Sequence, residues 1–333
     1  MKLIRPSYEI IEQGPGLQGI YDIIEKCGKT SYKSEPKGGE TARKFVEARA
    51  KEGHGAVLEF GTVYLKMTVP NPVAFDNKVF SWTSADAIIF YKMNHYSKVV
   101  QKDNVVYITT NYRVLVENDR LADLWYLCEP TEYHEKRYAV KFITDIGLGR
   151  DFLRHRTMSM VQESTRYVNY MKEKFGEELT FVIPPWISEE ELAEGENIIW
   201  WDGDWVDGDK LKIVNGYDCA DHSDIETWLN SLYSSELAYR ALTNEGWSAQ
   251  QARSVLPLST KTEFVLCGFP DSWIHFFCLR SDIAATGKAH PMSIELANPL
   301  RDEFIKRQYI TEENLKHDAL ALYEAAHNKG RNK

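Results

Sequence analysis

The chain alternates segments of helical and strand periodicity, and this alternation constrains its fold more than any single residue does. Residues 40–52 carry apolar side chains at helical spacing and end at Gly53. Residues 61–69 are rich in β-branched and aromatic residues at a period of two, which indicates a strand. Residues 6–13 and 138–144 also indicate strands. We therefore expect an α+β fold.

Capping residues and helix breakers place the other helices. A serine followed three residues later by a glutamate is the pattern of a capping box, and it occurs at Ser188 and again at Ser223. The second box should open a long helix that ends near Gly246. Further helices are expected over residues 17–26, from Ile146 through residues 150–157, from Ser248 to Pro257, and over 271–283 and 292–309.

Two stretches interrupt this regular order. Residues 70–137 mix helix-like and strand-like pieces bounded by proline, asparagine and aspartate, and a turn-rich hairpin candidate follows residue 194. The chain has 333 residues and no internal repeat or low-complexity linker. We therefore predict one elaborated domain over residues 1–333, with insertions near 70–135 and 187–220.

Composition excludes several classes of protein. The formal charge of −9 disfavours non-specific nucleic-acid binding, which needs a broad basic face. The 5 cysteines form no CxxC pair, so we interpret them as free thiols of a reducing compartment. The N-terminus lacks the apolar run of a signal peptide, and no segment is apolar enough to span a membrane. We expect a soluble, cytoplasmic protein.

Residues 154–167, RHRTMSMVQESTRY, concentrate cationic and hydroxyl side chains. Guanidinium groups bind phosphate bidentately and serine hydroxyls add neutral donors, so this composition suits an anion site. The alternative is a solvated basic face of a helix, which would normally pair its arginines with glutamates four residues away. Glu163 is the only acid in the segment. The residues alone leave both interpretations open.

The same segment resembles the signature of flavin-dependent thymidylate synthases, which reads RHR, two residues, Ser, four residues, Ser, one residue, Arg-Tyr. Gln162 lies where the family usually has Glu or Gln. The fixed positions are filled by Arg154, His155, Arg156, Ser159, Ser164, Arg166 and Tyr167. Other matches follow the family's order, at residues 30–34, at Gly53-His54 with Glu59, at Ala252-Arg253 with Leu256-Pro257, and at 273–282.

The resemblance implies an activity and its cofactors. The chain would methylate dUMP to dTMP, with methylenetetrahydrofolate as carbon donor, FAD as cofactor and NADPH as reductant. Reduced flavin supplies the hydride in this family, so no cysteine nucleophile is needed. A central, mostly antiparallel sheet with flanking helices is expected, in a homotetramer whose active sites lie at subunit interfaces.

The resemblance also implies roles for individual residues. Arg280 would be catalytic, because a fixed cation at the uracil edge would stabilise negative charge and activate C5. Nucleotide binding would involve Asp151, Arg154, Gln162, Ser164, Arg166, Arg253 and Arg280, with Arg166 and Arg253 on the phosphate. FAD would be bound by His54, Arg154, His155, Arg156, Gln162 and His275, with His54 reaching the flavin of a neighbouring subunit.

The chain also departs from the family pattern. Phe60 replaces the second histidine of the family's GHxxxxEH stretch, and residues 268–271, GFPD, replace an Asn-x-Arg that contacts FAD in many members. Ala289, His290 and Glu295 only loosely match the family's Ala-Gln-x-Glu-Ile segment. These departures motivate two alternatives: a flavoenzyme of the same fold that acts on another pyrimidine nucleotide, and a non-catalytic nucleotide- or flavin-binding protein.

Other motifs are weaker. Gly14, Gly16 and Gly19 fit GxGxxG, but a second helix follows where a dinucleotide-binding unit needs a strand. Residues 202–209 resemble a calcium loop without its twelfth-position glutamate. The tryptophans at 200, 201 and 205 suit packing of an insertion better than base stacking. The histidines and cysteines lack zinc spacing, so we predict no metal.

Overall fold

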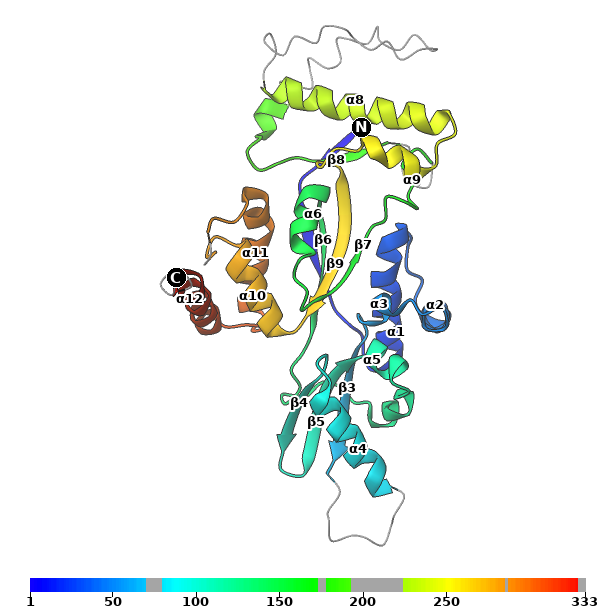
Figure 1. The fold of residues 1–333 in the computed structure, drawn as a ribbon, viewed down its shortest axis with the longest axis vertical. Coiled ribbons are helices and arrows are strands. Elements are labelled where there is room, and N and C mark those ends of the chain that lie inside the picture. The colour runs from blue at the N-terminus through cyan, green and yellow to red at the C-terminus, as the bar shows by residue number, and fades with distance from the viewer. Residues whose placement is uncertain (70–79, 173–177, 193–223, 285–286, 329–333) are drawn as a thin grey trace.

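The computed structural model describes residues 1–69, 80–172, 178–192, 224–284 and 287–328. Its central layer is a four-stranded sheet in which every neighbouring pair is antiparallel. Across the sheet the order is β2 (Ser7–Ile11), β6 (Tyr138–Asp145), β9 (Lys261–Gly268) and β7 (Ser159–Gln162). The expected α+β fold with a mostly antiparallel central sheet is confirmed (Figure 1).

Helices cover both faces of this sheet (Figure 1). Alternation along β9 explains the two layers, since Phe264 and Leu266 belong to one apolar core while Val265 and Cys267 belong to another. The first core packs against α6 (Ile146–Phe152), α10 (Pro270–Arg280), α11 (Pro291–Lys306) and α12 (Glu312–Asn328). The second packs against α1 (Gly16–Lys29), beside which lie η1 (Thr30–Tyr32), α2 (Gly39–Lys51) and α3 (Gly55–Leu58).

A second sheet of three strands lies beyond α1 (Figure 1). Helix α1 bridges the two sheets, because Ile23 and Cys27 pack on the four-stranded sheet while Ile20 and Ile24 join the core of the second one. Most of this part falls in the first predicted insertion. It comprises β3 (Thr62–Thr68), α4 (Phe80–Met93), β4 (Lys98–Lys102), β5 (Val105–Asn111), α5 (Tyr112–Glu117) and η2 (Leu121–Tyr126).

The opposite end of the molecule is built around a long helix (Figure 1). A short parallel pair of strands, β1 (Lys2–Ile4) and β8 (Thr180–Val182), lies beneath it. Tyr170, Phe181 and Tyr239 are buried in the core of this region. Its helices are α8 (Asp224–Asn244), α9 (Ala249–Ala252) and η6 (Arg253–Val255).

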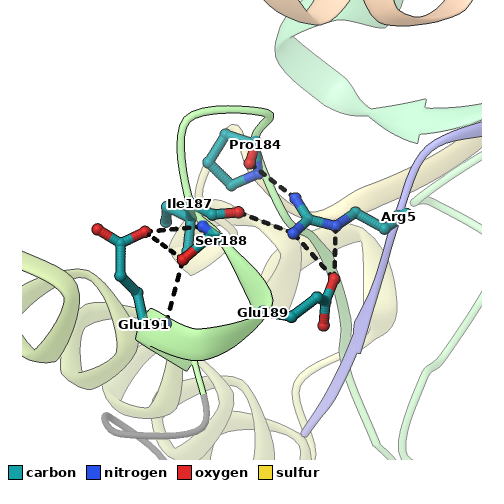
Figure 2. Close-up of polar contacts among 6 residues, drawn as sticks. All are labelled: Arg5, Pro184, Ile187, Ser188, Glu189 and Glu191. Carbon is teal, nitrogen blue, oxygen red and sulfur yellow. Dashed lines mark hydrogen bonds and ion pairs between the residues drawn. The ribbon is translucent and has the colours of Figure 1, made fainter.

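Arg5 joins the β1–β2 connection to the segment at the start of the second predicted insertion (Figure 2). Its guanidinium donates to the backbone carbonyls of Pro184 at 3.0 Å and Ile187 at 2.7 Å, and to the Glu189 carboxylate at 3.0 Å. The predicted capping box at Ser188 is present, since Glu191 accepts from the Ser188 backbone N–H at 2.7 Å and Ser188 Oγ accepts from the Glu191 N–H. These bonds fix the course of the chain from Pro184 to Glu191.

Arg5→Ala is expected to lower the free energy of unfolding by about 1–2 kcal/mol, because two carbonyls lose a charged donor. Glu189→Gln removes only an ion pair whose carboxylate is 75% exposed, so its effect should stay below about 0.5 kcal/mol. Urea unfolding of both variants measures the difference. Equal losses in the two variants would show that the carbonyl bonds contribute nothing.

Several helix predictions agree with the structure, and one is wrong. The helices expected over residues 17–26, 40–52, 271–283 and 292–309 correspond to α1, α2, α10 and α11, and Ser248 begins the helical turns that end before Pro257. The helix expected through residues 150–157 instead ends at Phe152. Arg154 and His155 bond back to the carbonyls three residues earlier, which tightens the chain into turns ahead of β7.

Some predictions fall on residues outside the described ranges. These are the hairpin after residue 194, the acidic loop at 202–209, the three tryptophans and Ser223 of the second capping box. The helix that this box should open is present as α8 and ends near Gly246 as expected. Within the described ranges, no helix is both long and apolar enough to cross a membrane. The division into one domain with two insertions stays a prediction.

Candidate active site

Arg280, at the end of α10, is bound by two groups from the segment around α6. Its Nε–H donates to Nε2 of His155 at 3.1 Å, and an Nη2–H donates to the backbone carbonyl of Asp151 at 2.8 Å. Because Nε2 accepts, the proton of neutral His155 lies on Nδ1. The structure thus brings together three of the predicted site residues, with Asp151 contributing its main chain.

The environment of His155 keeps the imidazole neutral. Its ring is buried against Phe276, with a centroid separation of 5.0 Å, and lies 6.0 Å from the ring of the exposed His275. Burial lowers the pKa of His155 to about 3, and the neighbouring Arg280 and His275 act in the same direction. A neutral ring can accept from Arg280, whereas an imidazolium would repel the guanidinium.

His155 should make the protein less stable in mild acid. In the unfolded chain His155 is protonated below its ordinary pKa near 6.5, whereas in the folded protein it stays neutral down to about pH 3. The stability contribution is therefore fully present above about 6.5 and is lost as the pH falls, by at most about 1.4 kcal/mol per pH unit. His155→Gln should flatten this dependence in urea unfolding at several pH values between about 5 and 7.

A matched control is His317→Gln, because His317 is an exposed histidine on α12. That variant should keep the pH dependence of the parent chain. If His155→Gln also kept it, the imidazole would not be held neutral in the folded state.

The second half of the signature lies at the free edge of the sheet. Gln162 ends β7 and donates from Nε2 to Thr262 Oγ1 on β9 at 3.1 Å. A Cβ at Gly149 of α6 would lie only 3.2 Å from that amide nitrogen, so glycine permits the close approach of α6. Ser164 then donates its backbone N–H to the carbonyl of Ser31 at 3.1 Å, which joins the loop to η1.

The arginines of the signature form no ion pair within the described part of the chain. Arg154, Arg156 and Arg166 are exposed, and no described carboxylate forms an ion pair with any of them. Arg253, also exposed, donates to Thr165 Oγ1 at 3.3 Å, and the Arg166 guanidinium lies over the ring of Tyr167. By contrast, the surface arginines Arg43 and Arg307 each pair with two glutamates. The unmatched charge favours an anion site over a solvated basic face.

Other predicted site residues lie apart from this cluster. His54 is exposed at the start of α3, where its nearest described carboxylate is Glu52 at 3.5 Å. Phe60 is fully buried among Ile23, Cys27 and Val265, where a histidine would have few polar partners. The departure at this position is therefore explained by core packing.

Residues of the GFPD segment contact other parts of the fold. Phe269 precedes α10 with Pro270 at its first turn, and Asp271 pairs with Lys98 of β4 at 2.9 Å. Arg137 lies near the Phe269 ring and donates to Ser159 Oγ of the signature at 2.8 Å. Sequence reasoning missed Arg137, because it stands alone just before β6 and only the fold brings it to Ser159.

The described cysteines are poor candidates for a nucleophile. Cys27, Cys267 and Cys278 are buried, and Cys128 is half-buried beside His134 at 3.9 Å. Burial raises the pKa of all four thiols. An un-ionised thiol is a weak nucleophile, so these side chains offer no activated thiolate. Among the described residues, no group of three or more His, Cys, Asp or Glu could hold a metal ion.

Residues 131–304 match the family model described as Thy1, thymidylate synthase complementing protein. This match covers more than half of the chain, and the chain belongs to that family. The matched range includes the signature and Arg280, whereas the resemblances at residues 30–34 and 53–59 lie before it. The family resemblance seen in the sequence is thereby confirmed.

Individual relatives are distant. The chain is 26% identical over 167 residues to a probable flavin-dependent thymidylate synthase of Paramecium bursaria Chlorella virus 1, covering 49% of this chain and 63% of the relative. It is 35% identical over 97 residues to the flavin-dependent thymidylate synthase of Synechocystis sp. (strain ATCC 27184 / PCC 6803 / Kazusa), covering 28% and 43%. It is 26% identical over 185 residues to the flavin-dependent thymidylate synthase of Thermosipho melanesiensis, covering 54% of this chain and 71% of the relative. The chain thus spans less than two thirds of the first two relatives.

Solved structures give a weaker comparison. A UMP/dUMP methylase, PolB from Streptomyces cacaoi, solved with 5-Br dUMP, aligns over 97% of this chain and 98% of its own, with 14% identity and a TM-score of 0.40. The same protein solved with 5-Br UMP gives the same score. A TM-score of 0.40 is too low to establish a shared fold.

Proposed function

We propose that this chain is a flavin-dependent thymidylate synthase, which methylates dUMP to dTMP with methylenetetrahydrofolate as carbon donor and NADPH as reductant. One observation carries the proposal. The signature arginines and Arg253 have no described carboxylate partners, and they accompany an Arg280 guanidinium that His155 and Asp151 hold in place. Such a set suits an anionic nucleotide whose ring must be polarised.

Different side chains would bind different parts of the nucleotide. Ser164, Arg166 and Arg253 would bind the phosphate, because a hydroxyl and two exposed guanidiniums are suitable donors. Gln162 would orient the nucleoside from the sheet edge. Arg154 would lie between nucleotide and cofactor. Burial lowers the pKa of Arg280, and the charge of Arg154 acts in the same direction.

Arg280 would act on the uracil. Two of its five N–H groups are used by His155 and Asp151, which leaves the others for a ligand. Held in one orientation, the cation would stabilise negative charge that develops at the uracil carbonyls and N3, and so make C5 nucleophilic. No enzyme thiolate takes part in this scheme.

The donor set also fits FAD by its charge. Arg154 and Arg156 are exposed cations without described carboxylate partners, which suits a diphosphate. His155 stands between them in the sequence, and the ring of His275 lies 6.0 Å from the ring of His155. When bound, FAD supplies the hydride that completes the methyl group. The exposed His54 would reach the flavin of a neighbouring subunit in a homotetramer, and light scattering of the purified protein tests that assembly.

Release of tritium from 5-tritiated dUMP tests the reaction. We expect release that depends on FAD, NADPH and methylenetetrahydrofolate together, because only methylation at C5 displaces that hydrogen. A second candidate is a flavoenzyme for another pyrimidine nucleotide. It is favoured by the GFPD segment, where Phe269 contacts Arg137 and Asp271 pairs with Lys98 in place of the FAD contact that many family members make there. Release from 5-tritiated UMP without release from dUMP would favour it, and nucleotide binding with no release from either would indicate a non-catalytic protein.

A further inference from the structure

Glu163 is a buried carboxylate in the middle of the signature. It stands between Gln162 and Ser164, two of the proposed nucleotide ligands, and its side chain is 1% exposed. Oε1 accepts from the Tyr170 hydroxyl at 3.1 Å, and Oε2 pairs with the Lys261 ammonium at 3.0 Å. Burying a carboxylate is unfavourable unless it is fully paired, so the Glu163 side chain can be buried here only because Tyr170 and Lys261 bind both of its oxygens.

The ion-pair partner of Glu163, Lys261, comes from the neighbouring strand β9. On β9, Lys261 and Glu263 share one face because strand side chains alternate, while Thr262 points to the other face and binds Gln162. Glu263 also pairs with Lys141 of β6 at 2.5 Å. A line of alternating charges therefore runs across three strands, from Lys141 through Glu263 and Lys261 to Glu163.

The backbone of Glu163 is bound at the same place. Its N–H donates to the carbonyl of Glu263 at 2.7 Å, which prolongs the β7–β9 pairing by one residue. The next residue, Ser164, leaves the sheet and bonds to Ser31. Both the side chain and the main chain of Glu163 thus fix the point, and the direction, at which residues 164–167 depart from the sheet.

We propose that Glu163, held by Lys261 and Tyr170, is a positioning residue that sets the phosphate-binding loop of residues 164–167. The proposal rests on the proposed nucleotide site and deepens it. Glu163 does not touch the ligand; it places Ser164 and Arg166, whose geometry a displacement of about 1 Å would spoil. A buried ion pair that only stabilised the fold would affect stability and leave nucleotide affinity unchanged.

Isothermal titration of dUMP into the FAD-loaded protein separates these roles. Glu163→Gln keeps the shape of the side chain and removes its charge, and Tyr170→Phe removes one hydrogen bond to it without changing charge. The matched control is Asp123→Asn, since Asp123 is another buried acid that accepts from a tyrosine, Tyr91, at 2.9 Å, but in the second sheet region. Thermal unfolding of each variant records its stability.

We expect Glu163→Gln to raise the Kd for dUMP about tenfold or more, Tyr170→Phe to raise it less, and Asp123→Asn to leave it unchanged despite a similar loss of stability. At saturating dUMP, turnover by Glu163→Gln should approach that of the parent. Parent-like affinity in Glu163→Gln, or equal weakening in Asp123→Asn, would contradict the positioning role alone. No dUMP binding by the unaltered protein would contradict the proposed function, and this inference with it.

Discussion

Replacing Arg280 with alanine is expected to lower turnover of dUMP by roughly 10²–10³-fold, the usual effect of removing one donor that stabilises charge in a transition state. The reason lies in the geometry of the guanidinium, which His155 and the Asp151 carbonyl fix in one orientation before any ligand arrives. FAD should stay bound, because the substitution removes none of the proposed flavin ligands, although His155 loses the donor that Arg280 provides. Tritium release at saturating substrates, with flavin absorbance of the purified variant, measures both effects.

Two further variants sharpen this prediction. Arg280→Lys keeps the charge but cannot reach two acceptors with a rigid fork, so it should recover only part of the lost turnover. Arg307→Ala removes an exposed arginine that pairs with Glu12 and Glu303, and it should leave turnover unchanged. Turnover by Arg280→Ala within a few-fold of the parent would remove Arg280 from the reaction.

The local structure of the signature could not be predicted from its residues alone. The density of arginine and serine over residues 154–167 left an anion site and a solvated basic face both open, and the structure leaves those arginines without described carboxylate partners. The helix expected there is wrong after Phe152, because the segment turns and then forms β7. Helical periodicity in a short polar segment does not reveal that the next residues pair with a distant strand.

Two elements could not be predicted for physical reasons. The start of strand β9 contains Lys261 and Glu263, and charged residues of this kind predict an exposed segment. In the structure their ion pairs with Glu163 and Lys141 offset the cost of burying their charges. Strand β5 passes directly into α5 with no glycine or proline between them. There Asn111 ends the strand and caps the helix by accepting from the Val114 N–H at 3.2 Å.

The site residues from separate segments show the same limit. Arg280 and His155 are 125 positions apart, and composition alone gives no reason to join them. The family resemblance supplied that connection as an expectation, and the fold places the two side chains in contact. Arg137 and Lys261 were not expected, because isolated cations carry no pattern until strands bring them to Ser159 and Glu163.

Lys261→Met is expected to lower the free energy of unfolding by about 3–5 kcal/mol, the usual cost of removing one partner of a buried ion pair. The Lys261 side chain is 8% exposed and that of Glu163 is 1% exposed, so little solvent can replace the lost ammonium. Glu163 would keep the hydrogen bond from the Tyr170 hydroxyl and the charge of nearby Lys33, but would lose its ion pair. Urea unfolding measures the loss, with Lys316→Met as the control, whose exposed pair with Glu312 should contribute less than about 0.5 kcal/mol.

The double variant Lys261→Met with Glu163→Leu distinguishes charge from packing as the cause. If the loss comes from an uncompensated carboxylate, removing that carboxylate should restore most of the stability, because apolar side chains of similar volume often replace a buried pair at little cost. A double variant as unstable as the single one would instead point to the packing of the lysine stem. The restored protein should still bind dUMP weakly, since an apolar core can hold the sheet together without directing the loop that carries Ser164 and Arg166.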